Sequence, residues 1–173
     1  MFKNAYFAGG CFWCTESIFQ RVKGVSLVIP GYMGGYIKNP SYHEVCSGKT
    51  GHTETIKITY DKNIISYSKL LEIFFFTHDP TKLNRQGNDV GTQYRSAVFF
   101  ENQSEKKQIL ESISIFEKKK IYNESFVTEI NKKIEFYDAE TEHHDYYNQN
   151  KSQSYCQFVI RPKIKKFENL LNK

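Results

Sequence analysis

Apolar and polar positions alternate in some segments of the chain and recur at helical spacing in others. Ile56, Ile58 and Tyr60 alternate with threonine and lysine, which predicts a half-buried β-strand over residues 54–60. Apolar side chains spaced three and four apart predict a helix over residues 66–77. The same criteria predict strands over 3–8, 25–29, 94–100, 126–130 and 134–137, and helices that start at Cys11 or span 105–120, 140–147 and 163–171.

Two long polar segments, residues 31–53 and 78–94, separate these elements and contain glycines without clear periodicity. Loops of such length inside a compact domain are usually functional or disordered, and the tyrosines, histidines and cysteine of residues 31–53 favour function. Helices and strands that mix without strict alternation predict an α+β fold, a two-layer sandwich of helices packed on a mixed or antiparallel sheet. The 173 residues contain no repeat and no linker, which predicts a single domain.

Charge and hydropathy limit the classes of function that this protein can have. The formal net charge is +5, but the lysines alternate with glutamates in residues 105–120 and 163–173, which argues for solvated helix faces and against nucleic-acid binding. No apolar run approaches the ~20 residues that cross a bilayer, so we expect no membrane association. The first ten residues do not resemble a secretory signal, so the expected location is cytoplasmic. In that compartment four cysteines suggest catalysis, redox exchange or metal binding.

The most informative short segment is "GGCFWC" at residues 9–14, which lies between a predicted strand and a predicted helix. A cysteine at a helix N-terminus is stabilised as a thiolate by unpaired N–H groups and the helix dipole. Gly9 and Gly10 allow a sharp turn before Cys11. Phe12 and Trp13 offer an apolar wall that suits a methyl group or a thioether.

The residues alone leave other interpretations of Cys11 open. A buried, unreactive cysteine is the common case at a strand–helix corner. A zinc site is a second possibility, because Cys11, Cys14, His43 and Cys46 have the spacing of zinc ligands within each pair. A general thiol–disulfide oxidoreductase of thioredoxin-like fold is a third, since that fold also begins a helix with C-x-x-C.

Three further motifs extend "GGCFWC": "GYMGGYIKNPSYHEVCSGKTGHTE" at 31–54, "RQGNDVGTQYRSA" at 85–97, and "FYDAETEHHDYYNQNKSQSYC" at 136–156. In this order and spacing the sequence resembles the A-type peptide methionine sulfoxide reductases over nearly its whole length. The resemblance implies a ferredoxin-like core and a single catalytic domain over residues 1–173. It also implies thiol-dependent reduction of methionine-S-sulfoxide, free or in proteins, as a repair reaction after oxidation.

The resemblance also assigns site residues and partners. It implies a mechanism without metal or organic cofactor, through a cysteine sulfenic acid and an intramolecular disulfide that thioredoxin or a similar dithiol reduces. Cys11 is then the nucleophile and Glu54 the acid that protonates the departing oxygen, a role that a raised pKa would favour. The pocket residues that it implies are Phe12 and Trp13 for the substrate methyl group, and Tyr42, Asp89 and Tyr94 around the oxygen and the acid.

The cysteine that resolves the sulfenic acid stays open at this stage. Cys14 is always close to Cys11, but a disulfide between them demands a suitable backbone geometry in the first helical turn. Cys156 lies in a polar segment, about 148–160, that we expect to be mobile, at a position where the family often has a recycling cysteine. Cys46 ranks last. Residues 157–173 lack the glycine-rich tail with a further cysteine that is common in the family, so the resemblance does not extend to a third recycling step.

Overall fold

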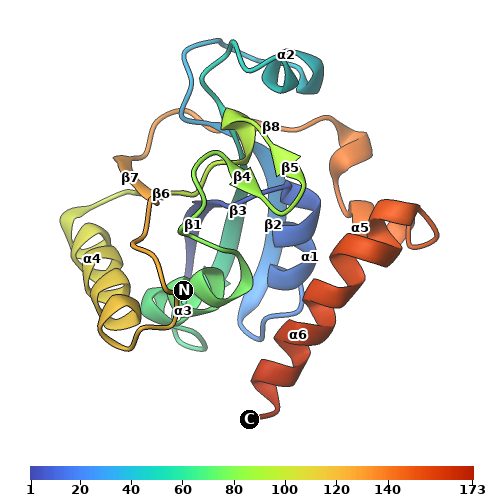
Figure 1. Cartoon of the computed structure of the whole chain (residues 1–173). Helices are drawn as coiled ribbons and strands as arrows, with labels where there is room; N and C mark the ends of the chain where they lie inside the picture. The colour runs from blue at the N-terminus through green and yellow to red at the C-terminus, as the bar shows by residue number, and fades with distance from the viewer.

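The computed structural model describes residues 1–173, and its framework is a βαββαβ unit (Figure 1). The alternating strands and the amphipathic helices occupy nearly the ranges that their periodicity predicts. The unit consists of β1 (Phe2–Ala8), α1 (Phe12–Phe19), β2 (Val25–Met33), β3 (Thr53–Asp61), α3 (Tyr67–Thr77) and β6 (Ala97–Phe100).

The main sheet has six strands in the order β7-β6-β1-β3-β2-β8, with the short strands β7 (Glu129–Lys132) and β8 (Tyr137–Asp138) at its edges. All neighbouring strands are antiparallel except β6 and β7, which are parallel. The connection and pairing of the four inner strands are those of a ferredoxin-like fold. The predicted α+β fold with a mixed sheet and a ferredoxin-like core is therefore confirmed.

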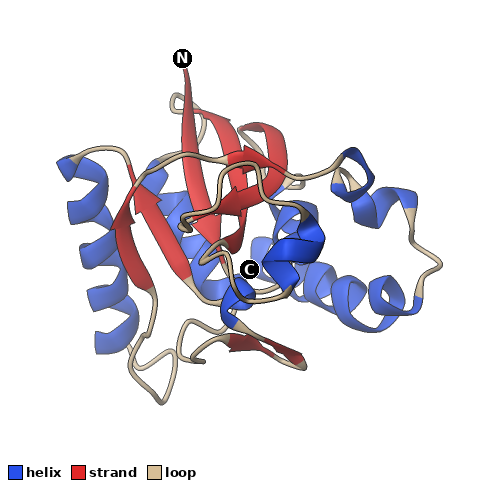
Figure 2. Ribbon diagram, turned by 90° about the horizontal axis from the view of Figure 1, so that it is seen from above, coloured by secondary structure: helices blue, strands red, loops and turns tan.

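Figure 2 shows the strands in red beside the blue helices. Buried residues of α1 and α3 pack with Phe7 on one face of the sheet, in a single large cluster. Helix α3 and helix α4 (Gln103–Lys118) begin with capping side chains, Ser66 and Asn102, which accept hydrogen bonds from backbone N–H groups of the first turn. The remaining elements are α2 (Tyr42–Cys46), β4 (Arg85–Gln86), β5 (Asp89–Val90), α5 (Tyr146–Gln149) and α6 (Arg161–Leu171).

The core follows from the alternation of side chains along the central strands. Ala5 and Phe7 of β1 join a large cluster with apolar residues of α1, α3 and α4, whereas Tyr6 and Ala8 face the other side of the sheet. There a smaller cluster forms, with Phe136 packed against it. Because both faces of β1 are buried, this strand is fixed in register and places the turn that follows it.

Several predicted boundaries are wrong. Strand β2 does not stop at Pro30 but continues to Met33, because β2 is next to the sheet edge and Pro30 still uses its carbonyl, which accepts a hydrogen bond from Ala139. Gly31 has no side chain, and a Cβ there would lie 2.3 Å from Phe136, so β8 can approach closely. The predicted strands over 126–130 and 134–137 are displaced toward the C-terminus.

Residues 31–53 are not a structureless loop, because they contain α2, which is closed by a capping box between Ser41 and Glu44. None of the helices has the length and apolar composition that a bilayer-crossing segment needs.

The C-terminal part of the chain folds back onto α1. Buried Glu16 of α1 accepts a hydrogen bond of 2.8 Å from the backbone N–H of Asp145, which has a left-handed conformation with φ of 56°. After α5, a π-helical turn at Cys156–Ile160 runs directly into α6, which lies beside α1 (Figure 1). The mobility of residues 148–160 stays a prediction, for a segment that folds here as turns and helix.

Candidate active site

Cys11 lies in the turn between β1 and α1, which Gly9 and Gly10 make possible. Gly10 has φ of +79°, and its N–H donates to the Tyr94 carbonyl over 3.1 Å. A Cβ on Gly9 would lie 2.7 Å from the ring of His78, so only glycine permits this approach. Cys11 itself is extended, with φ of −63° and ψ of 128°, and caps the N-terminus of α1 as its sequence position predicts.

Glu54 occupies a position on β3 where the alternation would place an apolar side chain, since Ile56 and Ile58 follow on the same face. Its Oε1 accepts the N–H of Phe12 over 3.1 Å, which ties the carboxyl to the first turn of α1. Its Oε2 is buried and has no hydrogen-bond partner. Burial raises the pKa of Glu54 to about 8, although the Phe12 N–H opposes this change, and Asp89 and Cys14 add to it. A carboxyl in this environment is protonated at neutral pH and can donate a proton.

Phe12 and Trp13, for which the sequence predicts an aromatic wall, lie in the first turn of α1, directly after Cys11. Phe12 is fully buried and packs against Tyr42. Trp13 is half-buried, and its Nε1–H donates to Nδ1 of His143 over 3.1 Å. Tyr146 stacks on Trp13 with ring centroids 3.7 Å apart and planes only 9° from parallel. The indole is therefore held by a hydrogen bond and a stacked ring, both from the C-terminal part of the chain.

The other predicted oxygen-side residues also converge on Glu54. Tyr42 comes from α2, Asp89 from β5 and Tyr94 from the 3-10 turn that precedes β6. The pKa of each tyrosine is raised, mainly by burial and next by the charge of Glu54. Two phenols that stay protonated beside a buried carboxyl can stabilise negative charge on a substrate oxygen. The structure thus brings together all the residues that the sequence assigns to the pocket.

The two thiols of the C-x-x-C motif are joined by a side-chain hydrogen bond, and their acidities differ. Burial raises the pKa of Cys11 well above its usual range, and Cys14 and Glu54 contribute to this rise. The pKa of Cys14 is lowered to about 7, first by the hydrogen bond from Cys11 and next by the charge of Lys163, against the effect of burial. In the resting site the thiolate is therefore favoured on Cys14. The expectation that the helix N-terminus would place it on Cys11 is wrong, because the polar partners gather around Cys14.

Cys156 is completely buried in the π-helical turn and packs in one cluster with Cys11 and Cys14. Burial raises its pKa, and the charge of Cys14 adds to this. Cys46 lies outside this cluster, on α2, where it is exposed. Both predicted resolving candidates are thus adjacent to the nucleophile, and Cys46 is not.

The zinc interpretation has no geometric support. The ligand atoms of Cys11, Cys14, His43 and Cys46 do not converge into one cluster, and the convergent group in the structure consists of Glu140, Glu142 and His143. Within that group Glu140 already accepts hydrogen bonds from the Tyr32 hydroxyl and the Tyr42 N–H.

Sequence reasoning missed four residues of the site. His143, Tyr146, Tyr155 and Lys163 all lie in the last 31 residues, and each contacts Trp13 or Cys14. The clustering of tyrosines in "DYYNQNKSQSY" was the available signal, because aromatic side chains are uncommon in polar segments that do not pack. Lys163 gives no such signal among the other lysines of α6.

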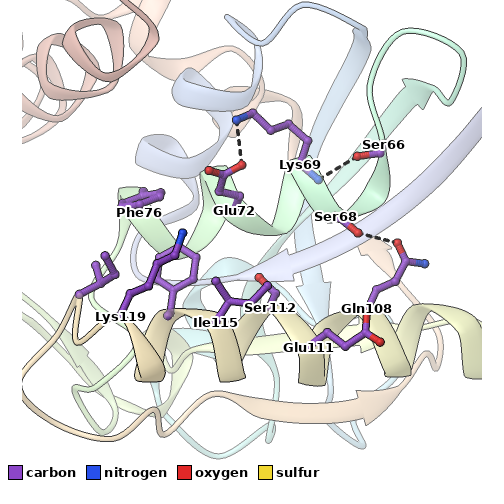
Figure 3. A pocket seen from close by; sticks show the side chains of 12 residues that line it. Ser66, Ser68, Lys69, Glu72, Phe76, Gln108, Glu111, Ser112, Ile115 and Lys119 are labelled. Atoms are coloured by element: carbon purple, nitrogen blue, oxygen red, sulfur yellow. Dashed lines mark hydrogen bonds and ion pairs between the residues drawn. The ribbon is translucent and has the colours of Figure 1, made fainter. Parts of the chain in front are cut away.

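A separate groove of about 410 Å³ lies between α3 and α4, and none of its lining residues belongs to the site (Figure 3). Lys69 and Glu72 form an ion pair of 2.8 Å there, and Ser68 donates to Gln108 across the two helices. Its polar groups are thus largely paired with one another, and we assign the groove no part in the chemistry.

Solved structures share this architecture. The crystal structure of Mxr1 from Saccharomyces cerevisiae in reduced form matches with a TM-score of 0.83 at 31% identity, covering 90% of this chain and 89% of that chain. A structure of Mxr1 in complex with Trx2 matches with a TM-score of 0.60 at 22% identity, covering 84% of each chain, and supports the shared fold. A ferredoxin-like fold with three thiols in one buried cluster defines the class of protein, an oxidoreductase that works through cysteine chemistry, and excludes the thioredoxin-like module.

The family follows from the sequence comparisons. A family model described as peptide methionine sulfoxide reductase matches residues 3–173. The peptide methionine sulfoxide reductase MsrA of Saccharolobus solfataricus is 52% identical over 166 residues, which cover 96% of this chain and 93% of that protein. The chain belongs to the peptide methionine sulfoxide reductase family and is an enzyme that reduces methionine sulfoxide with thiols. The function predicted from the motifs is confirmed.

Proposed function

We propose that this enzyme reduces methionine-S-sulfoxide, free or in proteins, with Cys11 as the nucleophile and Glu54 as the proton donor. One observation carries the assignment. The unpartnered Oε2 of Glu54 is buried beside the turn that begins with Cys11, and the pKa of this carboxyl is raised to about 8. An unsatisfied buried polar atom destabilises the fold by about 1–3 kcal/mol. A carboxyl that is kept in this state therefore indicates a function for its free oxygen.

The first step transfers oxygen from the substrate to Cys11. The Cys11 sulfur attacks the sulfoxide sulfur while its proton passes to the hydrogen-bonded Cys14 thiolate. Glu54 protonates the sulfoxide oxygen, which moves to Cys11 as its bond to the substrate sulfur breaks. The products are methionine, a sulfenic acid on Cys11, a neutral Cys14 thiol and an ionised Glu54, so atoms and charge balance.

The proposed pocket recognises the substrate with apolar residues on one side and polar residues on the other. The substrate methyl group would contact Phe12 and Trp13, where burial of one such group stabilises by roughly 1 kcal/mol. Tyr42, Asp89 and Tyr94 surround the oxygen side, and unmade hydrogen bonds there cost more than a lost methyl contact. Discrimination between the two epimers at sulfur therefore rests chiefly on the oxygen side.

The sulfenic acid on Cys11 is reduced first by Cys14, and the resulting disulfide is then passed on to Cys156. Cys14 returns its proton to Glu54 and attacks the sulfenic sulfur; the S–S bond forms, and the hydroxide leaves as water with the proton of Glu54. The extended backbone of Cys11 supports this local disulfide, because only Cys14 of the pair lies within the helix. Cys156 then attacks Cys14, and its proton passes to the sulfur of Cys11, which leaves as a thiol; the three thiols share one cluster.

Thioredoxin, or a similar dithiol, is the proposed external reductant of the final disulfide. The support is that Mxr1, 31% identical to this chain, has been crystallised with Trx2. We also propose a cytoplasmic location, where such a reductant keeps thiols reduced.

The assignment is tested with purified Cys11→Ser and Cys46→Ser variants, dithiothreitol as reductant, and both epimers of methionine sulfoxide. Cys46→Ser is the matched control, because Cys46 lies outside the thiol cluster. We expect Cys11→Ser to lose all reduction, and the control to reduce the S epimer like the unmodified enzyme and leave the R epimer. Reduction of the S epimer by Cys11→Ser, or equal use of both epimers by the control, would overturn the assignment.

A further inference from the structure

Lys163 brings a positive charge to the thiol cluster from the far end of the chain. Its Nζ lies 3.6 Å from the sulfur of Cys14, within hydrogen-bond distance for sulfur. Lys163 is half-buried, whereas Arg161, Lys165 and Lys166 on the same helix are exposed. The side chain is therefore set apart from its basic neighbours by its direction, toward α1 rather than toward solvent.

The groups around Cys14 leave Lys163 as the main source of positive charge. Tyr155 lies 3.6 Å from the Cys14 sulfur, but its single hydroxyl proton is donated to Asp89 over 2.6 Å. A charge-assisted hydrogen bond of this length is strong, so the hydroxyl proton of Tyr155 stays with the Asp89 carboxylate and is not donated to Cys14. The titratable groups that face Cys14 are Cys11, Tyr155, Asp89, Glu54, Cys156 and Lys163, and of these only Lys163 is a cation.

We propose that Lys163 is a positioning residue that holds the negative charge of the Cys11–Cys14 pair on Cys14, so that Cys14 is the thiolate that resolves the sulfenic acid. The inference deepens the proposed function and rests on it. The ammonium takes no proton from the reaction and forms no bond to substrate. It acts through Cys14, first by holding the resting charge on that sulfur, and again when Cys14 gives its proton to Glu54 and attacks Cys11.

The electrostatics agree with this geometry. The pKa of Cys14 is lowered to about 7 although the thiol is buried, and after the hydrogen bond from Cys11 the charge of Lys163 is the largest favourable influence. An opposite charge at this distance typically changes a pKa by about one unit or more. Without Lys163, both the burial of Cys14 and the charge of Asp89 would act against its thiolate.

The test compares the full-length enzyme with Lys163→Met, Lys163→Arg and Lys165→Met. Methionine keeps the length and packing of the lysine stem without charge, arginine restores the charge, and Lys165 is an exposed lysine of the same helix. Each protein is mixed with one equivalent of L-methionine-S-sulfoxide across a pH series. Released methionine and the Cys11–Cys14 disulfide are then measured by quenching and peptide mass mapping.

We expect the pH midpoint of disulfide formation to be about one unit or more higher in Lys163→Met than in the unmodified enzyme. Well below both midpoints this corresponds to about a tenfold loss of rate. Lys163→Arg and Lys165→Met should keep the original midpoint. An unchanged midpoint in Lys163→Met, or a uniform loss of rate at every pH as a merely structural role would give, overturns the inference.

The same experiment separates this inference from the proposed function. No release of methionine from the unmodified enzyme contradicts the function itself. Release of methionine with a first disulfide between Cys11 and Cys156 leaves the function intact and overturns the role of Lys163. If Lys163→Met does not fold, as judged by circular dichroism, Lys163→Gln is measured in its place and the same outcomes decide.

Discussion

The burial of Glu54 should make this enzyme less stable as the pH rises, and Glu54→Gln should remove the part of that dependence that Glu54 causes. The ordinary pKa of a glutamate is 4.5, and folding raises that of Glu54 to about 8. The native state therefore binds this proton more tightly than the unfolded chain. The contribution of Glu54 to stability is therefore full below pH 4.5 and is lost as the pH rises from 4.5 to about 8.

The magnitude follows from the interval between the two pKa values. From 4.5 to pH 7 there are 2.5 pH units, and at about 1.4 kcal/mol per unit the native state loses about 3 kcal/mol. Glu54 is only 1% exposed, so solvent does not screen this effect much. Glutamine keeps an oxygen for the Phe12 N–H and cannot ionise, so the variant should not show the loss.

Urea unfolding of the unmodified enzyme, Glu54→Gln and Glu111→Gln at pH 5 and pH 7 provides the measurement. Glu111 is the control because it is largely exposed. The stability advantage of Glu54→Gln over the unmodified enzyme should grow by about 2.5 kcal/mol between the two pH values, while the control follows the unmodified enzyme. Equal growth in both variants, or growth below about 1 kcal/mol, would refute the reasoning. The stabilised variant should also reduce sulfoxide about 10²–10⁴-fold more slowly, because it lacks the proton.

Three other perturbations have definite expected outcomes. Gly10→Ala should lower the free energy of unfolding by about 1–2 kcal/mol, because φ is +79° and a Cβ would lie 2.8 Å from Gln86; a change below 0.5 kcal/mol in urea unfolding would contradict this. Tyr146→Ala removes the ring stacked on Trp13 and should raise KM several-fold more than it lowers kcat; steady-state kinetics in which only kcat changes would count against a pocket role. Cys156→Ser should still release one equivalent of methionine but turn over slowly with thioredoxin, and unimpaired turnover would exclude Cys156 from the relay.

The local patterns of the sequence determined the framework and the reactive centre. Alternation at Ile56 and Ile58 placed β3, and helical spacing placed α3 and α4 within a few residues of their observed bounds. The turn of "GGCFWC" could be deduced because positive φ and close packing allow only glycine there. Glu54 is polar on an otherwise apolar strand face, which is a local inconsistency of the kind expected at a functional site.

Only the tertiary structure decided how the thiols are charged and held. The return of the C-terminal residues onto α1 places Tyr146 on Trp13, and Tyr155 and Lys163 beside Cys14. These contacts join residues more than 130 positions apart, and no periodicity records them. The thiolate is therefore favoured on Cys14 rather than on Cys11, against the expectation from the helix N-terminus. Acidity depends on the charges and hydrogen bonds that surround a group in space, whereas the sequence specifies only its neighbours along the chain.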